Sequence, residues 1–220
     1  MTKILITGAN RGIGLELARQ LAARGDEVIA VCRQPSEELK VLDVRIEPGV
    51  DVTDETSVRK LAEKLGDERI DVLLLNAGIL RRDGLSDLDL DAVRQQLEVN
   101  ALGPLRMAAA FEDRLPQGGK IALITSRMGS IADNGSGGYY GYRMSKVALN
   151  MAGVSLARDL QSRGVAVGIL HPGFVRTRMT DHQGNVDPAD AAAQLIQRID
   201  EISLDNTGSF RHANGETLPW

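Results

Sequence analysis

The sequence has few aromatic residues and no large excess of charge of either sign. Its 220 residues include three phenylalanines, three tyrosines and one tryptophan, so a core must be built from Val, Ile, Leu and Ala, which suits buried parallel strands. The formal net charge of −4 argues against a general nucleic-acid or membrane-surface binder. Apolar residues at 43% and charged residues at 25% exclude disordered, collagen-like and coiled-coil chains.

Cysteine and long apolar runs are also scarce. Cys32 is the only cysteine, so no internal disulfide can form, and we expect a reducing, cytoplasmic setting. No apolar run approaches membrane-spanning length, and the short run after Lys3 is unlike a signal peptide. His182 and His212 lack the Cys or carboxylate spacing of a metal site, so we expect no metal, no membrane segment and no targeting signal.

What is present is an alternation of short apolar runs and segments with helical periodicity. The strand candidates are Ile4–Ile6, Val28–Cys32, Val72–Leu75, Ile121–Ile124 and Val165–Leu170. The helical candidates are Gly12–Ala23, Glu55–Leu65, Leu88–Val99, Pro104–Leu115 and Lys146–Ser162. This alternation predicts an α/β fold, a Rossmann-type doubly wound parallel sheet with helices on both faces. No repeat or linker divides the chain, so residues 1–220 are expected to form a single dinucleotide-binding and catalytic domain.

A glycine-rich turn, TGANRGIG, follows the first strand and opens a helix. In such a turn Gly8 permits a tight bend, Gly12 lets the backbone approach a pyrophosphate, and Gly14 lets helix and strand pack closely. The pattern indicates a dinucleotide site, although glycines between a strand and a helix can be purely structural.

Two arginines favour NADP over NAD. Arg33 ends the second strand, 21 residues after Gly12, where NAD binders usually place an acid for the ribose hydroxyls. Arg11 lies inside the glycine turn, and two guanidiniums can hold a 2′-phosphate by charge-assisted hydrogen bonds. The alternative is that both are solvated surface charges.

Tyr142 and Lys146 lie four residues apart, so on a helix they share a face. The other two tyrosines, Tyr139 and Tyr140, have no lysine at that spacing. A neighbouring cation, together with an oxidised nicotinamide, favours the phenolate and makes Tyr142 a workable acid–base group. An ordinary cation–tyrosine pair on a helix surface is the alternative.

Together these motifs resemble the short-chain dehydrogenase/reductase family over almost the whole chain. Further matches are Asp51 in DVTD, Asn76-Ala77-Gly78, Asn100 in VNALGP, Ser126 in ITSRMG, and Pro172-Gly173 followed by Val175 and Thr177. The resemblance implies Asn100, Ser126, Tyr142 and Lys146 as catalytic residues. It implies NADP(H) contacts from Gly8, Asn10, Arg11, Gly12, Ile13, Gly14, Arg33, Asp51, Val52, Asn76, Ala77, Gly78, Tyr142, Lys146, Pro172, Gly173, Val175 and Thr177.

The Cys32-Arg33-x-Pro35 string and the Gly215–Trp220 ending resemble the sniffer-like and C-factor-like carbonyl reductases within that family. This implies reduction of an aldehyde, ketone or quinone by hydride transfer. Ser126 and Tyr142 would polarise the oxygen, Lys146 would grip the ribose, and Asn100 would help to hold a water. The family often pairs through helices equivalent to Pro104–Leu115 and Lys146–Ser162, which is compatible with a homodimer as well as with a monomer.

Several alternatives and details stay open. A non-catalytic NADP-binding sensor on the same fold is one rival, although a binder needs no acid–base set; a sugar-nucleotide epimerase is another, although the C-terminal part is short. Only ten residues separate Thr177 from Pro188, which predicts an open pocket with loose substrate selection. Arg127 follows Ser126 at a position where many members of the family have smaller residues, so the resemblance does not define the substrate class. His171 is expected to be a hydrogen-bonded structural histidine, and Trp220 to dock its apolar ring on the domain or on a partner subunit.

Overall fold

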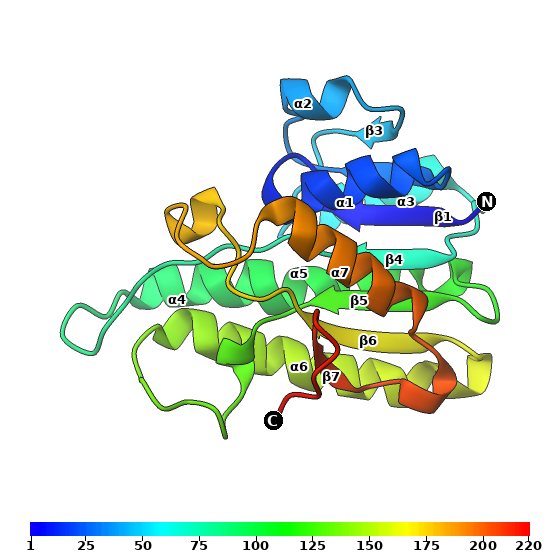
Figure 1. The fold of residues 1–220 in the computed structure, drawn as a ribbon. Helices are drawn as coiled ribbons and strands as arrows, with labels where there is room; N and C mark the ends of the chain where they lie inside the picture. The colour runs from blue at the N-terminus through cyan, green and yellow to red at the C-terminus, as the bar shows by residue number, and fades with distance from the viewer.

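The computed structural model describes all residues from 1 to 220 and contains one sheet of seven parallel strands (Figure 1). The strands are β1 (Lys3–Thr7), β2 (Glu27–Val31), β3 (Arg45–Glu47), β4 (Val72–Leu75), β5 (Lys120–Ile124), β6 (Ala166–His171) and β7 (Phe210–His212). Their order in the sheet is β3-β2-β1-β4-β5-β6-β7. Strands β2 and β3 thus lie on one side of β1, and β4 to β7 lie on the other. This confirms the expected Rossmann-type doubly wound sheet.

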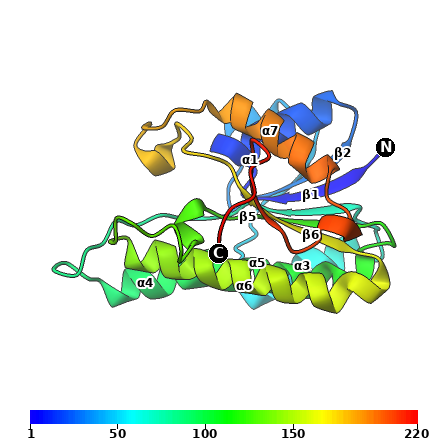
Figure 2. The same cartoon turned by 60° about the horizontal axis from the view of Figure 1, so that its bottom comes forward.

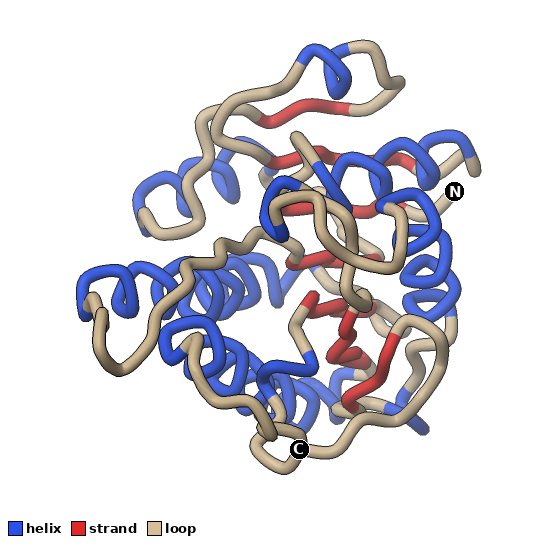
Figure 3. The backbone as a smooth tube through the Cα atoms, turned by 60° about the vertical axis from the view of Figure 1, so that its left-hand side comes forward, coloured by secondary structure: helices blue, strands red, loops and turns tan.

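Seven α-helices surround the sheet. They are α1 (Gly12–Ala23), α2 (Glu37–Lys40), α3 (Glu55–Leu65), α4 (Leu90–Leu97), α5 (Gly103–Phe111), α6 (Tyr140–Leu160) and α7 (Pro188–Asp200). Helices α1 and α7 lie on one side of the sheet, and α3, α5 and α6 lie on the other (Figure 2). Figure 3 shows the strands stacked between these two helical layers.

The sheet is buried because both of its faces carry apolar side chains. One core joins alternate strand residues such as Leu73 and Ile121 to α3, α5 and α6. The other joins the intervening residues, such as Leu74 and Ala122, to α1 and α7. Neighbouring strand residues therefore point to opposite layers, as the two-residue period of a strand requires.

The expected elements are present, with shifts at their ends and some omissions. Helix α1 and strand β4 have the predicted bounds, whereas α6 begins at Tyr140, six residues before the expected start. The two helices expected on either side of Asn100 are α4 and α5. A π-helical turn, Glu98–Leu102, connects the end of α4 directly to the start of α5. Strands β3 and β7 were not predicted, because each has only three residues and too few alternations to give a pattern. Helices α2 and α7 were also missing from the predicted elements.

The carboxyl ends of all the strands meet at one edge of the sheet, because every strand pair is parallel. The glycine turn after β1, the Asn76 segment after β4, Ser126 after β5 and Pro172 after β6 therefore reach the same edge. This is the edge where doubly wound sheets bind ligands. Elsewhere, no helix combines the length and the apolar character needed to cross a membrane.

Candidate active site

The glycine turn packs so closely that side chains would not fit at two of its positions. Gly8 has a left-handed φ of 70°, and a Cβ on it would lie 2.9 Å from Ala77 Cα. A Cβ on Gly14 would lie 2.3 Å from the Gly8 carbonyl oxygen and 2.5 Å from Asn76 Nδ2. Gly14 thus sets the distance between helix α1 and the sheet, as the sequence predicts.

Helix α1 starts with free backbone donors. Arg11 precedes it without a capping hydrogen bond from its side chain, and the first turn carries no acidic residue. By contrast, Asp54 and Asp89 cap helices α3 and α4 with their carboxylates. An uncapped helix start directs N–H groups and positive dipole charge outward, which suits an anionic ligand.

Asn76 ties the end of β4 to the glycine turn. Its Nδ2 donates to the carbonyl oxygens of Thr7 at 3.1 Å and Gly8 at 3.3 Å. The Thr7 hydroxyl oxygen accepts the backbone N–H groups of Asn76 and Ala77, each at 3.1 Å. The Asn-Ala-Gly motif therefore holds the turn in place with its own hydrogen bonds.

Arg11 and Arg33 are exposed beside the glycine turn and the end of β2. Arg11 makes no ion pair, whereas Arg33 lies 3.9 Å from Asp51 Oδ2. Burial pushes the pKa of Asp51 upward, but hydrogen bonds from Thr53 together with the charges of Arg33 and Arg106 outweigh it and hold that pKa below its ordinary value. Asn10 links the turn to the same region, because its Nδ2 donates to the Gln34 carbonyl at 3.2 Å.

Tyr142 and Lys146 are both buried on helix α6, with exposed fractions of 8% and 4%. Lys146 Nζ lies 5.7 Å from the centre of the Tyr142 ring and donates to the Ile124 carbonyl at 3.0 Å. A Cβ on Gly78 would lie 3.8 Å from Lys146 Nζ and 3.3 Å from Asn100 Oδ1. Residues from three segments of the chain thus converge on the lysine.

Burial governs the protonation of this pair. It raises the pKa of the Tyr142 phenol to about 12, against an opposing effect of the Ser126 side chain. It lowers the pKa of Lys146 to about 8. The acidification expected of Tyr142 is therefore not supplied by the chain alone, because loss of hydration disfavours both the phenolate and the ammonium ion.

Asn100 is fully buried in the π-helical turn, where its side chain is held at both ends. Its Oδ1 accepts the Ile79 N–H at 2.8 Å, and its Nδ2 donates to the Ile79 carbonyl at 2.9 Å and to Ser145 Oγ at 3.0 Å. Ser145 in turn donates to the Tyr142 carbonyl at 2.7 Å. This chain of hydrogen bonds connects Asn100 to helix α6 beside Tyr142 and Lys146.

Ser126 is buried at the end of β5 and faces the same helix. Its Oγ accepts the Met128 N–H at 3.1 Å, which leaves its own proton for another acceptor. The segment is fixed to α6 by Asn150, whose Oδ1 accepts from Thr125 at 2.7 Å and whose Nδ2 donates to Gly129 at 3.1 Å. No local pattern pointed to Thr125, Ser145 or Asn150, because their hydrogen-bond partners lie 21 to 45 residues away.

The segment after β6 returns to the glycine turn. Pro172 and Val175 are buried, and Gly173 has a left-handed φ of 91°. A Cβ on Gly12 would lie 3.5 Å from Thr177 Cγ2, so this segment and the turn approach each other. Of the other predicted contacts, Ile13 is partly buried and Val52 is buried, with its carbonyl accepting from Arg106 at 2.6 Å.

His171 differs in part from its expected role. Its Nδ1 is buried without a hydrogen-bond partner, so it is not the hydrogen-bonded histidine that the sequence suggested. Its ring meets His212 edge to face at 4.9 Å between centres. Burial lowers the pKa of His171 to about 3, and the nearby His212, Arg127 and Lys146 act in the same direction. The His171 ring is therefore neutral at pH 7.

Arg127, directly after Ser126, is partly exposed and pairs with two carboxylates. Its guanidinium contacts Glu216 at 2.9 Å and Asp133 at 3.1 Å. This connects the serine segment to the C-terminal residues, where Trp220 stacks on Phe210 at 5.3 Å between ring centres. Of the two sites expected for the Trp220 ring, the domain itself and a partner subunit, it contacts the domain. A second ion pair, between Arg82 and Asp181 at 2.8 Å, joins the residues after Gly78 to the segment after Thr177.

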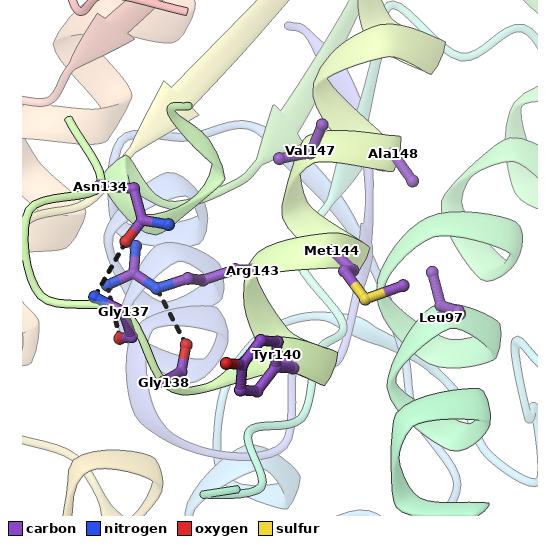
Figure 4. Close-up of a pocket in the computed structure, with 9 residues that line it drawn as sticks. All are labelled: Leu97, Asn134, Gly137, Gly138, Tyr140, Arg143, Met144, Val147 and Ala148. Atoms are coloured by element: carbon purple, nitrogen blue, oxygen red, sulfur yellow. Dashed lines mark hydrogen bonds between the residues drawn. The ribbon is translucent and has the colours of Figure 1, made fainter. Parts of the chain in front are cut away.

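A cavity of about 500 Å³ lies outside this cluster, on the outer surface of α6 (Figure 4). Its walls include apolar side chains of α4 and α6, among them Leu97, Met144 and Val147, and the glycine-rich loop before α6. Neither Tyr142 nor Ser126 lines it. Arg143 donates to the carbonyls of Gly137 and Gly138 at one end of the cavity.

The residues at the sheet edge fit a nicotinamide dinucleotide phosphate. The uncapped start of α1 supplies donors for a pyrophosphate, and the close packing at Gly8 and Gly14 leaves backbone rather than side chains there. Arg11 and Arg33 supply cations suited to a 2′-phosphate. By comparison, no cluster of His, Cys, Asp or Glu that could hold a metal ion is present.

Comparison with known proteins points in the same direction. The model of the short chain dehydrogenase family matches residues 2–187. The 1-hydroxy-2-glutathionyl-2-methyl-3-butene dehydrogenase of Rhodococcus sp. strain AD45 is 42% identical, over 100% of both chains. The C-signal protein of Myxococcus xanthus is 40% identical, over 69% of this chain and 93% of that protein.

Two solved structures share the whole fold. Carbonyl reductase Sniffer of D. melanogaster has a TM-score of 0.92 and 29% identity, over 100% of both chains. The NADPH-bound carbonyl reductase from chicken fatty liver has a TM-score of 0.91 and 28% identity, over 100% of this chain and 99% of that one. The likeness to sniffer-like and C-factor-like proteins, expected from the sequence, is confirmed.

Proposed function

The chain belongs to the short chain dehydrogenase family of oxidoreductases, and from that membership we propose that it is an NADP(H)-dependent carbonyl reductase. In this proposal residues 1–220 act as one dinucleotide-binding and catalytic domain. One observation carries the proposal. Ser126, Tyr142, Lys146 and Asn100 converge at the carboxyl-terminal edge of the sheet, the same edge that bears the glycine turn.

The cofactor assignment rests on charge. An exposed Arg11 without an acidic partner and an Arg33 only loosely paired with Asp51 favour the 2′-phosphate of NADP(H) over the free ribose hydroxyls of NAD(H). The NADPH named with the chicken liver reductase supports the same choice. The remaining predicted cofactor residues lie in the turns that follow β1, β3, β4 and β6, in the first turn of α1, and, for Tyr142 and Lys146, on α6.

In the proposed reaction, bound NADPH supplies the hydride to the carbonyl carbon. Ser126 would donate its hydroxyl proton to the carbonyl oxygen, while its own oxygen accepts the Met128 N–H. Tyr142 transfers its phenolic proton to that oxygen as the alcohol forms. With a pKa of about 12 the phenol stays protonated at neutral pH, as a proton donor in reduction must be.

Lys146 and Asn100 serve the tyrosine in this proposal. Lys146, with a pKa of about 8, can lose and regain a proton near neutral pH. When charged, it favours the phenolate left after proton transfer. Asn100 fixes the residues after Gly78 and, through Ser145, the Tyr142 backbone, and so keeps the groups in register.

The substrate is proposed to be a small carbonyl compound, such as an aldehyde, ketone or quinone. The relative from Rhodococcus carries in its name a hydroxyl compound that bears a glutathionyl group. A test panel therefore includes aldehydes, ketones, quinones and a glutathionyl alcohol, the last assayed with NADP⁺. We also propose a reducing compartment such as the cytoplasm, since Cys32 is buried and free.

A homodimer is proposed through the outer faces of α5 and α6. Met151 is 66% exposed, Met144 50% and Leu105 41%, all on these helices. Exposed apolar side chains gathered on neighbouring helices are typical of an interface. The cavity beside Met144 and Leu97 would lie at the edge of that contact (Figure 4).

The experiment that tests the proposed function follows absorbance at 340 nm with NADPH and with NADH across the carbonyl panel. We expect oxidation of NADPH by at least one carbonyl class and a much weaker rate with NADH. Tight NADPH binding without turnover of any panel compound would favour the alternative, a non-catalytic NADP-binding sensor on the same fold.

A further inference from the structure

Helix α6, which carries Tyr142 and Lys146, begins without a cap from its own sequence. Tyr139 precedes it with a left-handed φ of 53° and no capping hydrogen bond from its side chain, and the first turn contains no acidic residue. The first N–H groups of a helix have no partner inside the helix. They must be satisfied from elsewhere or left to water.

Asp83, 58 residues earlier in the chain, provides that cap. Its Oδ2 accepts the N–H of Gly141 at 3.0 Å. Its backbone carbonyl accepts the N–H of Tyr139 at 2.8 Å. A carboxylate at a helix start is also favoured by the helix dipole. One residue of the segment after Gly78 therefore holds both sides of the first residue of α6.

Helix α4 also packs against the start of α6, through Gln96, whose side chain is fully buried. Gln96 Oε1 accepts the N–H of Arg81 at 2.8 Å, two residues before Asp83. A Cβ on Gly141 would lie 2.3 Å from Gln96 Nε2 and 3.0 Å from the Val93 Cα. Only glycine fits there, so α4, α6 and the Arg81–Asp83 segment are packed together next to Tyr142.

The junction is retained at a cost in stability. Asp83 Oδ1 and Gln96 Nε2 are both buried without a hydrogen-bond partner. An unpaired buried polar group loses its hydration without a replacement hydrogen bond, which lowers the stability of the folded chain. Proteins keep such costs mainly where a site requires the arrangement, and here the arrangement adjoins Gly141, the residue directly before the proposed proton donor.

We propose that Asp83 is a positioning residue for the reaction: it sets the start of α6 and thereby the place of the Tyr142 hydroxyl relative to Ser126. This inference rests on the carbonyl-reductase function proposed above. Asp83 acts only through the helix start, so its loss should affect the chemical step and not the binding of the dinucleotide at α1. Displacement of a reacting group by about 1 Å can cost roughly a hundredfold in rate.

The test compares Asp83→Ala, which removes the acceptor, with Asp83→Asn, which keeps an oxygen acceptor for the Gly141 N–H. We expect Asp83→Ala to lower kcat at least about tenfold, with the Kd for NADPH unchanged, and Asp83→Asn to recover most of kcat. Asp87→Ala is the matched control, because Asp87 lies in the same segment and accepts only the Gly84 N–H at 2.7 Å. It should keep the parent kcat.

Parental kcat in Asp83→Ala, or equal impairment of the Ala and Asn variants, would overturn the inference. If Asp83→Ala does not fold, Asp83→Ser is compared with Asp83→Asn in the same way. If the parent protein reduces no carbonyl, the proposed function fails. The Asp83 cap on the start of α6 is then tested on its own by amide hydrogen exchange. Faster exchange of Gly141 in Asp83→Ala than in Asp83→Asn then supports it, and equal exchange contradicts it.

Discussion

Lys146 Nζ lies 5.7 Å from the centre of the Tyr142 ring, and both side chains are buried. At this separation the lysine acts on the phenol by its charge, which is weakly screened in a buried site. Its Nζ–H bond to the Ile124 carbonyl, at 3.0 Å, holds the ammonium in place. The pair thus combines a phenol that keeps its proton with a lysine that can change its charge near neutral pH.

The buried lysine predicts a particular dependence of stability on pH. Burial lowers the pKa of Lys146 from 10.5 to about 8, so folding carries the cost of a buried cation below pH 8. Between pH 8 and 10.5 the unfolded chain binds more protons than the folded one, and the free energy of unfolding should rise through this window by about 3 kcal/mol.

The measurement compares the free energy of unfolding of the parent and Lys146→Met, by urea denaturation at several pH values. Lys146→Met is expected to be the more stable protein at pH 7, and the difference should shrink as the pH approaches 10.5. A difference that stays constant from pH 7 to 10.5 would show that Lys146 is not buried as a titrating group.

Coenzyme preference should depend on the two arginines near the glycine turn. Arg11→Ala and Arg33→Ala are each expected to raise the KM for NADPH about 10- to 100-fold, the loss of a charge-assisted hydrogen bond. The KM for NADH should change little. Arg59→Ala is the control, since Arg59 is exposed on α3 with only a distant partner, Glu63. Equal effects on both coenzymes would contradict recognition of the 2′-phosphate.

Close packing at Gly14 predicts a large difference between two glycine substitutions. In Gly14→Ala the added methyl would meet the Gly8 carbonyl and Asn76, so we expect a loss of about 1–3 kcal/mol in stability and weaker NADPH binding. Gly135→Ala is the matched control, because nothing lies within 4 Å of its Cβ position. Thermal unfolding should separate the two variants by several degrees; coincident curves would exclude the tight contact.

The proposed homodimer gives a prediction about mass in solution. Met151→Lys places a charge on the exposed face of α6 and should yield a monomer in sedimentation equilibrium, where the parent is a dimer. Val41→Lys is the control, because Val41 is 80% exposed at the end of α2, away from that face. A monomeric parent would exclude the dimer.

The fold was predictable because its main strands and helices are patterned locally. Helix α1 has apolar residues at core spacing and β4 is a continuous apolar run, and both were predicted with the bounds observed. Strand β7 could not be predicted, because Phe210, Arg211 and His212 give no alternation and pair with β6 only in the folded sheet.

The candidate site divides in the same way. Tyr142 and Lys146 share a helix face by spacing alone, so their proximity follows from the sequence. The Asp83 cap on Gly141 joins residues 58 positions apart, and no local pattern encodes such a contact. The pKa of Tyr142 could not be predicted from the sequence either, since burial sets it and that burial arises only when α6 packs in the folded chain.

The central claim, that Tyr142 donates the proton in carbonyl reduction, is tested most directly by Tyr142→Phe. NADPH affinity is measured by calorimetry and turnover by absorbance at 340 nm, on the carbonyl that the parent reduces fastest. We predict an unchanged Kd for NADPH and a kcat lowered by about 10²- to 10⁴-fold. A variant that reduces the carbonyl at the parental rate would contradict the claim.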